Sequence, residues 1–438
     1  MNPDQQPVAA PSFAEALRFW VKLGFISFGG PTGQIAIMHT ELVERRKWVS
    51  EERFLHALNY CMLLPGPEAT QLATYVGWLL HGTWGGIVAG AFFVIPSIFV
   101  LLALSWIYAA HGSVPWIAAI FFGLKPAVMA IVAAAVIRIG QKALKNGVMY
   151  ALAVAAFVAI YFFRAPFPGI IFTAGLIGLL GGKYYPRKFQ VIKGHETTPG
   201  REEVAVHRQA RVRPTLARGL KVTAICLGLW WTPVLLLGLW RGWNSVFVRE
   251  GLFFSTAAMV TFGGAYAVLP YVARAAVDTY GWLRAGQMLD GLGLAETTPG
   301  PLIMVVQFVG FMGGWNQADG MAPWLAGIIG ALITTWVTFV PCFLWIFLGA
   351  PYIEMMRGQV KFTSALSAIT AAVVGVVLNL AVWFGMHTLF PETGGVNWFA
   401  VVVGGISFLG LWRWQWGVLP VVLGSGALGL AYYWVRVG

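Results

Sequence analysis

Long apolar stretches without charged residues follow one another along most of this chain. Between Arg53 and Lys125 the only charged side chain is Glu68. Because about 20 apolar residues suffice to cross a bilayer as a helix, this pattern predicts many membrane-spanning helices. We expect nine, over Trp84–Tyr108, Val114–Ile137, Gly147–Phe163, Phe167–Gly182, Val222–Trp240, Met321–Leu348, Thr363–Phe390, Val396–Trp412 and Trp414–Trp434.

Four further apolar stretches are interrupted by glycine and proline, and they form two pairs. The first pair is Phe13–Gly30, ending in Phe28-Gly29-Gly30-Pro31, and Phe54–Gly82, which contains Pro65-Gly66-Pro67. The second pair is Gly251–Gly264, ending in Phe262-Gly263-Gly264, and Ala285–Gly314, which contains Pro299-Gly300-Pro301. Adding one constant to the residue numbers brings Gly66 onto Gly300. The same shift aligns residues 25–67 with residues 259–301 without a gap, and ten of the aligned positions are identical. We call it the repeat shift and interpret it as an internal duplication.

The number of crossings between the two copies predicts their relative orientation. If each broken pair returns to its starting side, five full spans separate the copies, and the second copy is inverted. The fold expected is an all-α polytopic membrane protein with two inverted-topology repeats, whose Gly/Pro-broken helices are re-entrant or discontinuous. The expected parts are a tail at 1–12, a first repeat at 13–182, a basic loop at 183–221, a linking helix and outer loop at 222–247, a second repeat at 248–412 and a terminal helix at 413–438.

Composition and charge agree with a membrane protein. The chain is 58% hydrophobic and 11% charged, which excludes a soluble multi-domain enzyme. Its net charge is +12, and the stretch from Lys183 to Lys221 holds ten Lys and Arg against three Glu. Positive charge in a short loop marks the cytoplasmic side, so we expect this loop and the N-terminus there, and no nucleic-acid partner. Residues 1–12 predict no cleavable signal peptide.

The helix breaks predict an anion-binding site. Glycine permits an unusual backbone at a helix end, and proline suits the first position of a new helix. Each new N-terminus leaves N–H groups unpaired within the membrane, where an anion would satisfy them. We therefore expect four helix N-termini to converge on one substrate. The candidate binding residues are Gly29, Gly30, Pro31, Thr32, Gln34, Pro65, Gly66, Pro67, Glu68, Thr70, Gln71, Gly263, Gly264, Tyr266, Thr297, Thr298, Pro299, Gly300 and Pro301.

Charged residues near the breaks are candidates for coupling, gating or attraction of substrate. Ionisable groups at membrane depth are costly, which makes Glu68, Asp290 and Glu296 functional candidates, although satisfied caps or rim positions explain them equally well. The cations considered are Lys22, Arg45, Arg46, Lys47 and Lys125, most of which suit interface anchors. We find no nucleotide-binding loop, no nucleophile set and no metal or cofactor site, so an enzyme is not expected.

The motifs together resemble the chromate ion transporter family in its long two-domain form. The resemblance rests on Phe28-Gly29-Gly30-Pro31, Glu44-Arg45-Arg46-Lys47-Trp48 and Leu64-Pro65-Gly66-Pro67-Glu68 with Gln71, and on the stretches Phe262–Pro270 and Thr297–Pro301 of the second copy. It implies a multi-pass protein of the bacterial inner membrane that exports chromate. The residues alone indicate only an anion transporter. Ala265 stands where the first copy has Pro31, so the four helix starts are not all equivalent.

Other functions remain open at this point. A carrier of sulfate or another small anion would have the same features, because sulfate shares the shape and charge of chromate. A membrane assembly protein without transport activity is a further alternative, against which the paired breaks argue. A uniporter driven by the membrane potential and an ion exchanger are equally compatible with the sequence, and a homodimer is compatible with its glycine-rich faces.

Overall fold

The computed structural model describes residues 11–28, 30–189, 215–355, 363–391 and 394–437. Within these ranges every regular element is a helix and no strand occurs. Seven of the described helices are long and apolar enough to cross a membrane. The expected all-α polytopic membrane fold is therefore confirmed. Most of the expected tail at 1–12, Gly29 and most of the basic loop at 183–221 lie outside the described residues.

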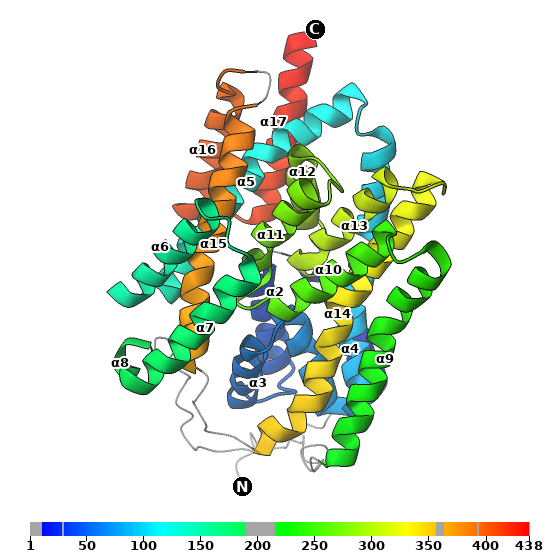
Figure 1. Cartoon of the computed structure of the whole chain (residues 1–438), viewed down its shortest axis with the longest axis vertical. Helices are drawn as coiled ribbons and strands as arrows, with labels where there is room; N and C mark the ends of the chain where they lie inside the picture. The colour runs from blue at the N-terminus through cyan, green and yellow to red at the C-terminus, as the bar shows by residue number, and fades with distance from the viewer. Residues whose placement is uncertain (1–10, 29, 190–214, 356–362, 392–393, 438) are drawn as a thin grey trace.

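The first copy of the repeat opens with short helices and continues into long ones (Figure 1). Polar caps begin two of the short helices: Ser12 Oγ accepts from the Glu15 N–H, and Ser50 Oγ accepts from the Arg53 N–H. The elements are α1 (Phe13–Ile26), α2 (Gly30–His39), the π-helix η1 (Thr40–Arg45), α3 (Glu51–Leu63), α4 (Glu68–His111), α5 (Pro115–Ala143), α6 (Gly147–Tyr161), α7 (Phe167–Tyr184) and α8 (Pro186–Phe189).

The second copy follows a linking helix and has the same order of elements at its start. The linking helix is α9 (Leu216–Arg241). After it come α10 (Val246–Val260), α11 (Ala265–Arg274), η2 (Ala275–Thr279), α12 (Ala285–Thr297), η3 (Leu302–Met304), α13 (Val305–Asn316), α14 (Pro323–Met355), α15 (Thr363–Leu389), α16 (Trp398–Trp412) and α17 (Val418–Val437).

Each of the nine spans expected from the sequence overlaps one described helix. Two of these helices, α6 and α16, have only 15 residues. At about 1.5 Å per residue they are roughly 22 Å long, which is less than the ~30 Å of a bilayer core. Large apolar side chains such as Phe163 and Leu239 are more than 70% exposed at the molecular surface. Lipid is the solvent that such a surface requires.

The helix described as α4 is a hairpin of two helical arms. At Gly82 the backbone has φ 65° and ψ −153°, which is not helical. The arms pack so closely that a Cβ added at Gly77 would collide with the carbonyl of Gly85, and the reverse holds too. In the second copy α13 and α14 pack with the same closeness, through Gly310 and Gly330. Glycines permit these close contacts because they lack a side chain.

The duplicated segments correspond in structural detail. Helices α3 and α12 have 13 residues each, and the repeat shift brings the bounds of α3 onto those of α12 and η1 nearly onto η2. The Trp48 N–H donates to the Leu42 carbonyl at 2.8 Å, and the Trp282 N–H donates to the Ala276 carbonyl at 2.8 Å. In Figure 1, α3 and α12 lie toward opposite ends of the molecule, with α2 and α11 between them.

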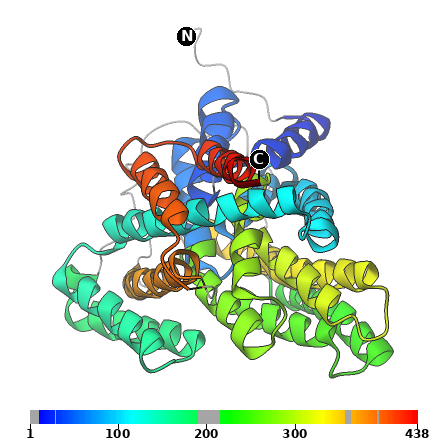
Figure 2. The ribbon, with the colours of Figure 1, turned by 90° about the horizontal axis from the view of Figure 1, so that it is seen from above.

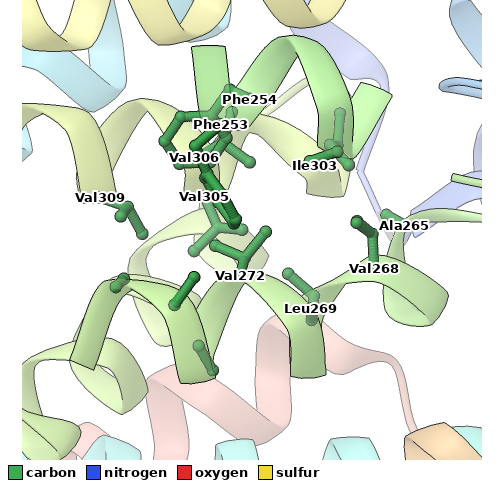
Figure 3. Packing of buried hydrophobic residues seen from close by; sticks show 14 of the residues in the cluster. Phe253, Phe254, Ala265, Val268, Leu269, Val272, Ile303, Val305, Val306 and Val309 are labelled. Atoms are coloured by element: carbon green, nitrogen blue, oxygen red, sulfur yellow. The ribbon is translucent and has the colours of Figure 1, made fainter. Parts of the chain in front are cut away.

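Two groups of long helices flank the duplicated short helices. In one, α5 packs against α15, α16 and α17, while α6 and α7 pack against α15 at one side of the molecule (Figure 2). In the other, α14 packs against α4, α9, α10 and α13. The largest buried core joins the second group to α11 and η3, where Phe254, Leu269, Ile303 and Val306 lie close together (Figure 3). This packing fixes the ends of the short helices relative to the long ones.

Candidate functional site

One cavity lies where the beginnings of short helices from both copies meet. Its volume is about 360 Å³, within the range of roughly 300–1,000 Å³ typical of small-molecule sites. The start of α2, the start of α11 and Glu68 at the start of α4 all line it. Helices α5 and α15 contribute polar side chains to its wall, α5 with Arg138 and Lys142 and α15 with Thr370.

The two short helices that reach the cavity begin at glycines with left-handed backbone. Gly30 has φ 71°, Gly263 has φ 78° and Gly264 has φ 93°. A Cβ added at Gly264 would lie 4.0 Å from Cγ of Pro31, so the two helix starts are neighbours. The first N–H groups of α2 and α11 have no partner within their own helices. Two helix N-termini thus present partial positive charge to one space.

Two cations on α5 add full positive charge to this cavity. Arg138 and Lys142 are one helical turn apart and line the same wall. Neither makes an ion pair with any acidic residue in the described part of the chain. A guanidinium beside an ammonium repels it unless an anion lies between them, so an anionic ligand would stabilise the pair.

Carboxyl groups mark the inner side of the site. Glu68 is buried at the first position of α4 and lines the cavity. Glu296 is also buried, and its Oε1 accepts a hydrogen bond of 2.5 Å from the hydroxyl of Tyr266. Because Tyr266 lines the cavity, a ligand that draws its hydroxyl away would leave Glu296 without this donor.

Each Pro-Gly-Pro break donates a backbone hydrogen bond to the other copy. The Gly66 N–H donates to the Thr261 carbonyl at 2.8 Å, and the Gly300 N–H donates to the Ser27 carbonyl at 2.7 Å. The repeat shift that brings Gly66 onto Gly300 also brings Ser27 onto Thr261. The two bonds are therefore reciprocal between positions that the repeat shift relates. Gly66 and Gly300 have φ 117° and 96°, which their missing side chains permit.

The polar residues of the first copy bond to these breaks. The amide of Gln34 donates to the Gly300 carbonyl at 2.6 Å, and that of Gln71 donates to the Pro65 carbonyl at 2.7 Å. The carbonyl oxygens of both side chains and the buried hydroxyl of Thr70 have no partner within the described residues. The two glutamines thus hold the breaks in place at the interface between the copies. Thr32 lies in the first turn of α2.

The fourth expected helix start lies apart from the cavity. After Pro299, Gly300 and Pro301 the chain forms the short 3-10 helix η3, which is fully buried. The hydroxyl of Ser97 on α4 donates to the Pro299 carbonyl. The hydroxyls of Thr297 and Thr298 donate to carbonyls of their own helix, α12. The structure therefore brings together three of the four expected helix starts.

Lys125 and Asp290 form a separate polar group. Lys125 Nζ lies 3.8 Å from Asp290 Oδ2, and the hydroxyl of Tyr108 donates to the same oxygen at 2.8 Å. This group joins α4, α5 and α12, and none of its members lines the cavity.

The basic cluster of the first copy surrounds one acid. Glu41 accepts from Arg45 at 2.8 Å and lies 3.4 Å from Arg46 Nε. Burial raises the pKa of the Glu41 carboxyl, but the bonds and charges of Arg45, Lys22 and Arg46 outweigh burial and leave this pKa below its ordinary value. Arg46 also stacks over Trp48. Lys22 and Lys47 are exposed at this surface.

The residues that sequence reasoning did not include are Arg138, Lys142 and Thr370. In the sequence both cations lie near the end of an apolar span, where Lys and Arg usually mark the cytoplasmic side of the membrane. Their spacing of four residues, on the same face of a helix, was the available signal. Nothing in the sequence connects Thr370 with the distant glycines Gly30 and Gly264.

Comparison with known proteins identifies the family. The sequence profile described as "Chromate transporter" matches residues 14–179 and 249–430. A probable chromate transport protein of Synechococcus elongatus is 27% identical over 405 residues, covering 92% of this chain and 91% of that protein. A chromate transport protein of Pseudomonas aeruginosa is 28% identical over 426 residues, covering 95% and 92%.

A shorter relative matches part of the chain, an uncharacterised transporter of Bacillus subtilis. It is 32% identical over 131 residues, which are 29% of this chain and 64% of that protein. No solved structure matches the chain. The profile covers both duplicated segments and most of the described helices, several of which are able to span a bilayer. The chain is a multi-pass membrane protein and belongs to the chromate transporter family.

Proposed function

We propose that this protein is a secondary transporter that carries chromate, a tetrahedral dianion, out of the cytoplasm. The observation that carries the proposal is the cavity in which the starts of α2 and α11 meet Arg138 and Lys142. Helix N-termini and paired cations are two arrangements by which proteins bind oxyanions. The chromate transport proteins named above support chromate as the ion.

The expected inverted arrangement of the copies fits this site. The reciprocal bonds of Gly66 and Gly300 support a local two-fold relation, and the opposite positions of α3 and α12 in Figure 1 support an axis that inverts the copies. Inverted repeats with broken helices bind substrate near the middle of the membrane. Rocking of the two copies about this site would expose it to each side in turn.

We infer that the protein lies in the inner membrane of a bacterial cell, with its N-terminus and the loop at 183–221 in the cytoplasm. The excess of Lys and Arg in that loop supports this orientation. Moving one charge through ~100 mV is worth about 2.3 kcal/mol, so a dianion that leaves a negative-inside cell gains about 4.6 kcal/mol. Export therefore requires no ATP, and it proceeds as uniport or in exchange for another ion.

The test is uptake of labelled chromate into proteoliposomes with the membrane potential set by ion gradients. We expect uptake to follow an inside-positive potential. Arg138→Gln and Lys142→Gln each remove one charged hydrogen-bond donor worth about 2 kcal/mol, which corresponds to a roughly 30-fold higher half-saturating concentration. Lys145→Gln is the matched control, because Lys145 is near the same helix end but bonds to the Gln141 carbonyl outside the cavity.

The same assay separates the alternatives. Sulfate, phosphate and molybdate are added as competitors at equal concentration. Stronger competition by sulfate than by chromate itself would identify a sulfate carrier. An absence of uptake of either ion by folded protein would refute transport and favour an assembly role. Equal effects of Lys142→Gln and Lys145→Gln would place the anion elsewhere.

A further inference from the structure

Another buried acid lies in α10 and does not line the anion cavity. The Glu250 side chain is fully buried, with 0% of its surface exposed. Neither Oε1 nor Oε2 has a hydrogen-bond partner in the described part of the chain. It does not line the cavity, and sequence reasoning did not select it because its surroundings carry no motif. Buried polar groups are nearly always bonded, so an unbonded carboxyl requires an explanation.

Two glycines make room for this carboxyl between α13 and α14. A Cβ at Gly313 would collide with Glu250 Oε1, and a Cβ at Gly330 would lie 2.9 Å from Oε2. Gly330 is also in close backbone contact with Gly310 of α13. The carboxyl thus occupies a space that two helices leave free for it. Side chains larger than hydrogen at either glycine would displace it.

Within the described ranges, no charged group compensates an ionised Glu250. The helix α10 packs against α9, α11, α13 and α14. Residues 305–316 and 323–352, which include all of α13 and most of α14, contain no Asp, Glu, Lys, Arg or His. The titratable groups of the neighbouring helices whose side chains the structure describes are Arg218, Lys221, Cys226 and Arg241 of α9, Tyr266, Tyr271 and Arg274 of α11, and Cys342 and Tyr352 of α14, beside Arg249 of α10 itself.

None of these groups bonds to Glu250. Arg241 bonds instead to Asp319, by its guanidinium to the backbone carbonyl and to the carboxylate. An isolated carboxylate in such an environment is far more costly than a neutral carboxyl. The form that these helices accommodate is therefore the protonated acid.

A donor without an acceptor lies beside the same glycine. The indole N–H of Trp282 is buried and has no acceptor among the described residues, and the Cγ of this residue lies 3.1 Å from the position of a Cβ at Gly313. A small shift of α13 would change which groups face Glu250. The first copy has no equivalent, because Ala16 and Leu79 stand where the second copy has Glu250 and Gly313.

We propose that Glu250 is a proton-binding site of the second copy, separate from the anion cavity, and that it gains and loses its proton during the transport cycle. The binding of a proton by Glu250 does not depend on anion transport, whereas the gain and loss of that proton during the cycle rests on the proposed anion transport. Acids within membrane-spanning segments form the proton relays of many pumps and transporters.

Infrared spectroscopy of the full-length protein in liposomes tests the proton site without any transport. We expect a carbonyl stretching band of a protonated carboxylic acid that is lost in Glu250→Gln. The amide is close in shape to the neutral acid, so this variant should fold, which size-exclusion chromatography checks. Glu41→Gln is the control and should not change the band, because Glu41 is bonded to two arginines. A band that persists unchanged in Glu250→Gln overturns the proposal.

Transport as a function of pH tests the coupling. We expect the initial rate of chromate uptake to depend on pH in the wild type, and this dependence to be lost in Glu250→Gln but kept in Glu250→Asp. A pH profile of Glu250→Gln identical to that of the wild type refutes coupling. If no form of the protein takes up chromate, the proposed anion transport fails, while the infrared band still decides whether Glu250 holds a proton.

Discussion

The Pro-Gly-Pro break of the second copy provides a quantitative test of the architecture. We predict that Gly300→Ala destabilises the protein strongly. Gly300 has φ 96°, a conformation that costs a residue with a side chain about 1–3 kcal/mol. The added Cβ would also collide with the Ser97 hydroxyl, which donates to the Pro299 carbonyl. Displacing this bond costs about 1 kcal/mol, and overpacking a further 1–3 kcal/mol.

The expected loss is therefore roughly 3–7 kcal/mol, the sum of backbone strain, a lost hydrogen bond and overpacking. Gly30→Ala isolates the strain, because Gly30 has φ 71° and no atom within 4 Å of its added Cβ. We expect it to lose only about 1–2 kcal/mol. Gly385→Ala, in an open position within α15, should be neutral or stabilising, since alanine favours helix more than glycine.

A double-mutant cycle separates the steric part from the strain. Ser97→Ala removes the hydroxyl and leaves its Cβ 3.0 Å from the new Cβ at Gly300. In this background Gly300→Ala should cost about 1–2 kcal/mol less than in the wild type. The assay is reversible unfolding in mixed micelles, followed by tryptophan fluorescence. This description of the break is refuted if Gly300→Ala is as stable as the wild type. It is also refuted if Gly300→Ala loses the same free energy of unfolding in the wild type and in Ser97→Ala.

Three further predictions concern polar groups. Lys125→Met should be less destabilising when Asp290 is also changed to Asn than in the wild type, because the double variant leaves no unpaired charge; equal unfolding midpoints in both backgrounds would contradict the ion pair. Tyr266→Phe should lower the free energy of unfolding by about 2 kcal/mol, because the hydroxyl of Tyr266 donates to a carboxyl. The control Tyr150→Phe should have a smaller effect, because Tyr150 is exposed on α6. The stability advantage of the wild type over Glu41→Gln should be complete above pH 4.5 and disappear as the pH falls further, because the folded-state pKa of Glu41 is lowered; unfolding curves at several pH values measure this.

The apolar pattern and the Gly/Pro motifs predict much of this fold. Spans and breaks depend on local chemistry, such as the length of an uncharged stretch or the backbone freedom of Gly66, and the sequence carries this information directly. The internal duplication predicts which elements correspond, and α3 and α12 do correspond in length and position. The helices found for two of the nine expected spans have only 15 residues: α6 ends before the expected Phe163, and α16 begins after the expected Val396.

The residues that line the cavity are harder to predict from the sequence. Arg138 and Lys142 reach the cavity because α5 packs beside the helix starts, and this depends on tertiary packing. The start after Pro301 lies outside it: there the chain forms the buried 3-10 helix η3, and the preceding break accepts a hydrogen bond from Ser97 of α4. Equal motifs at equal spacing therefore do not ensure equal surroundings once the two copies pack against different long helices.

The reciprocal bonds of the two breaks also bear on how such a protein could evolve. In a chain with a single copy of the repeat, each of these bonds could form only between two subunits, and folding would then depend on protein concentration. Fusion supplies the second copy at a fixed, high effective concentration. It also frees the copies to differ: Gln34 in the first, which bonds to Gly300, corresponds to Val268 in the second. Covalent linkage thus allows one copy to specialise while the other preserves the shared junction.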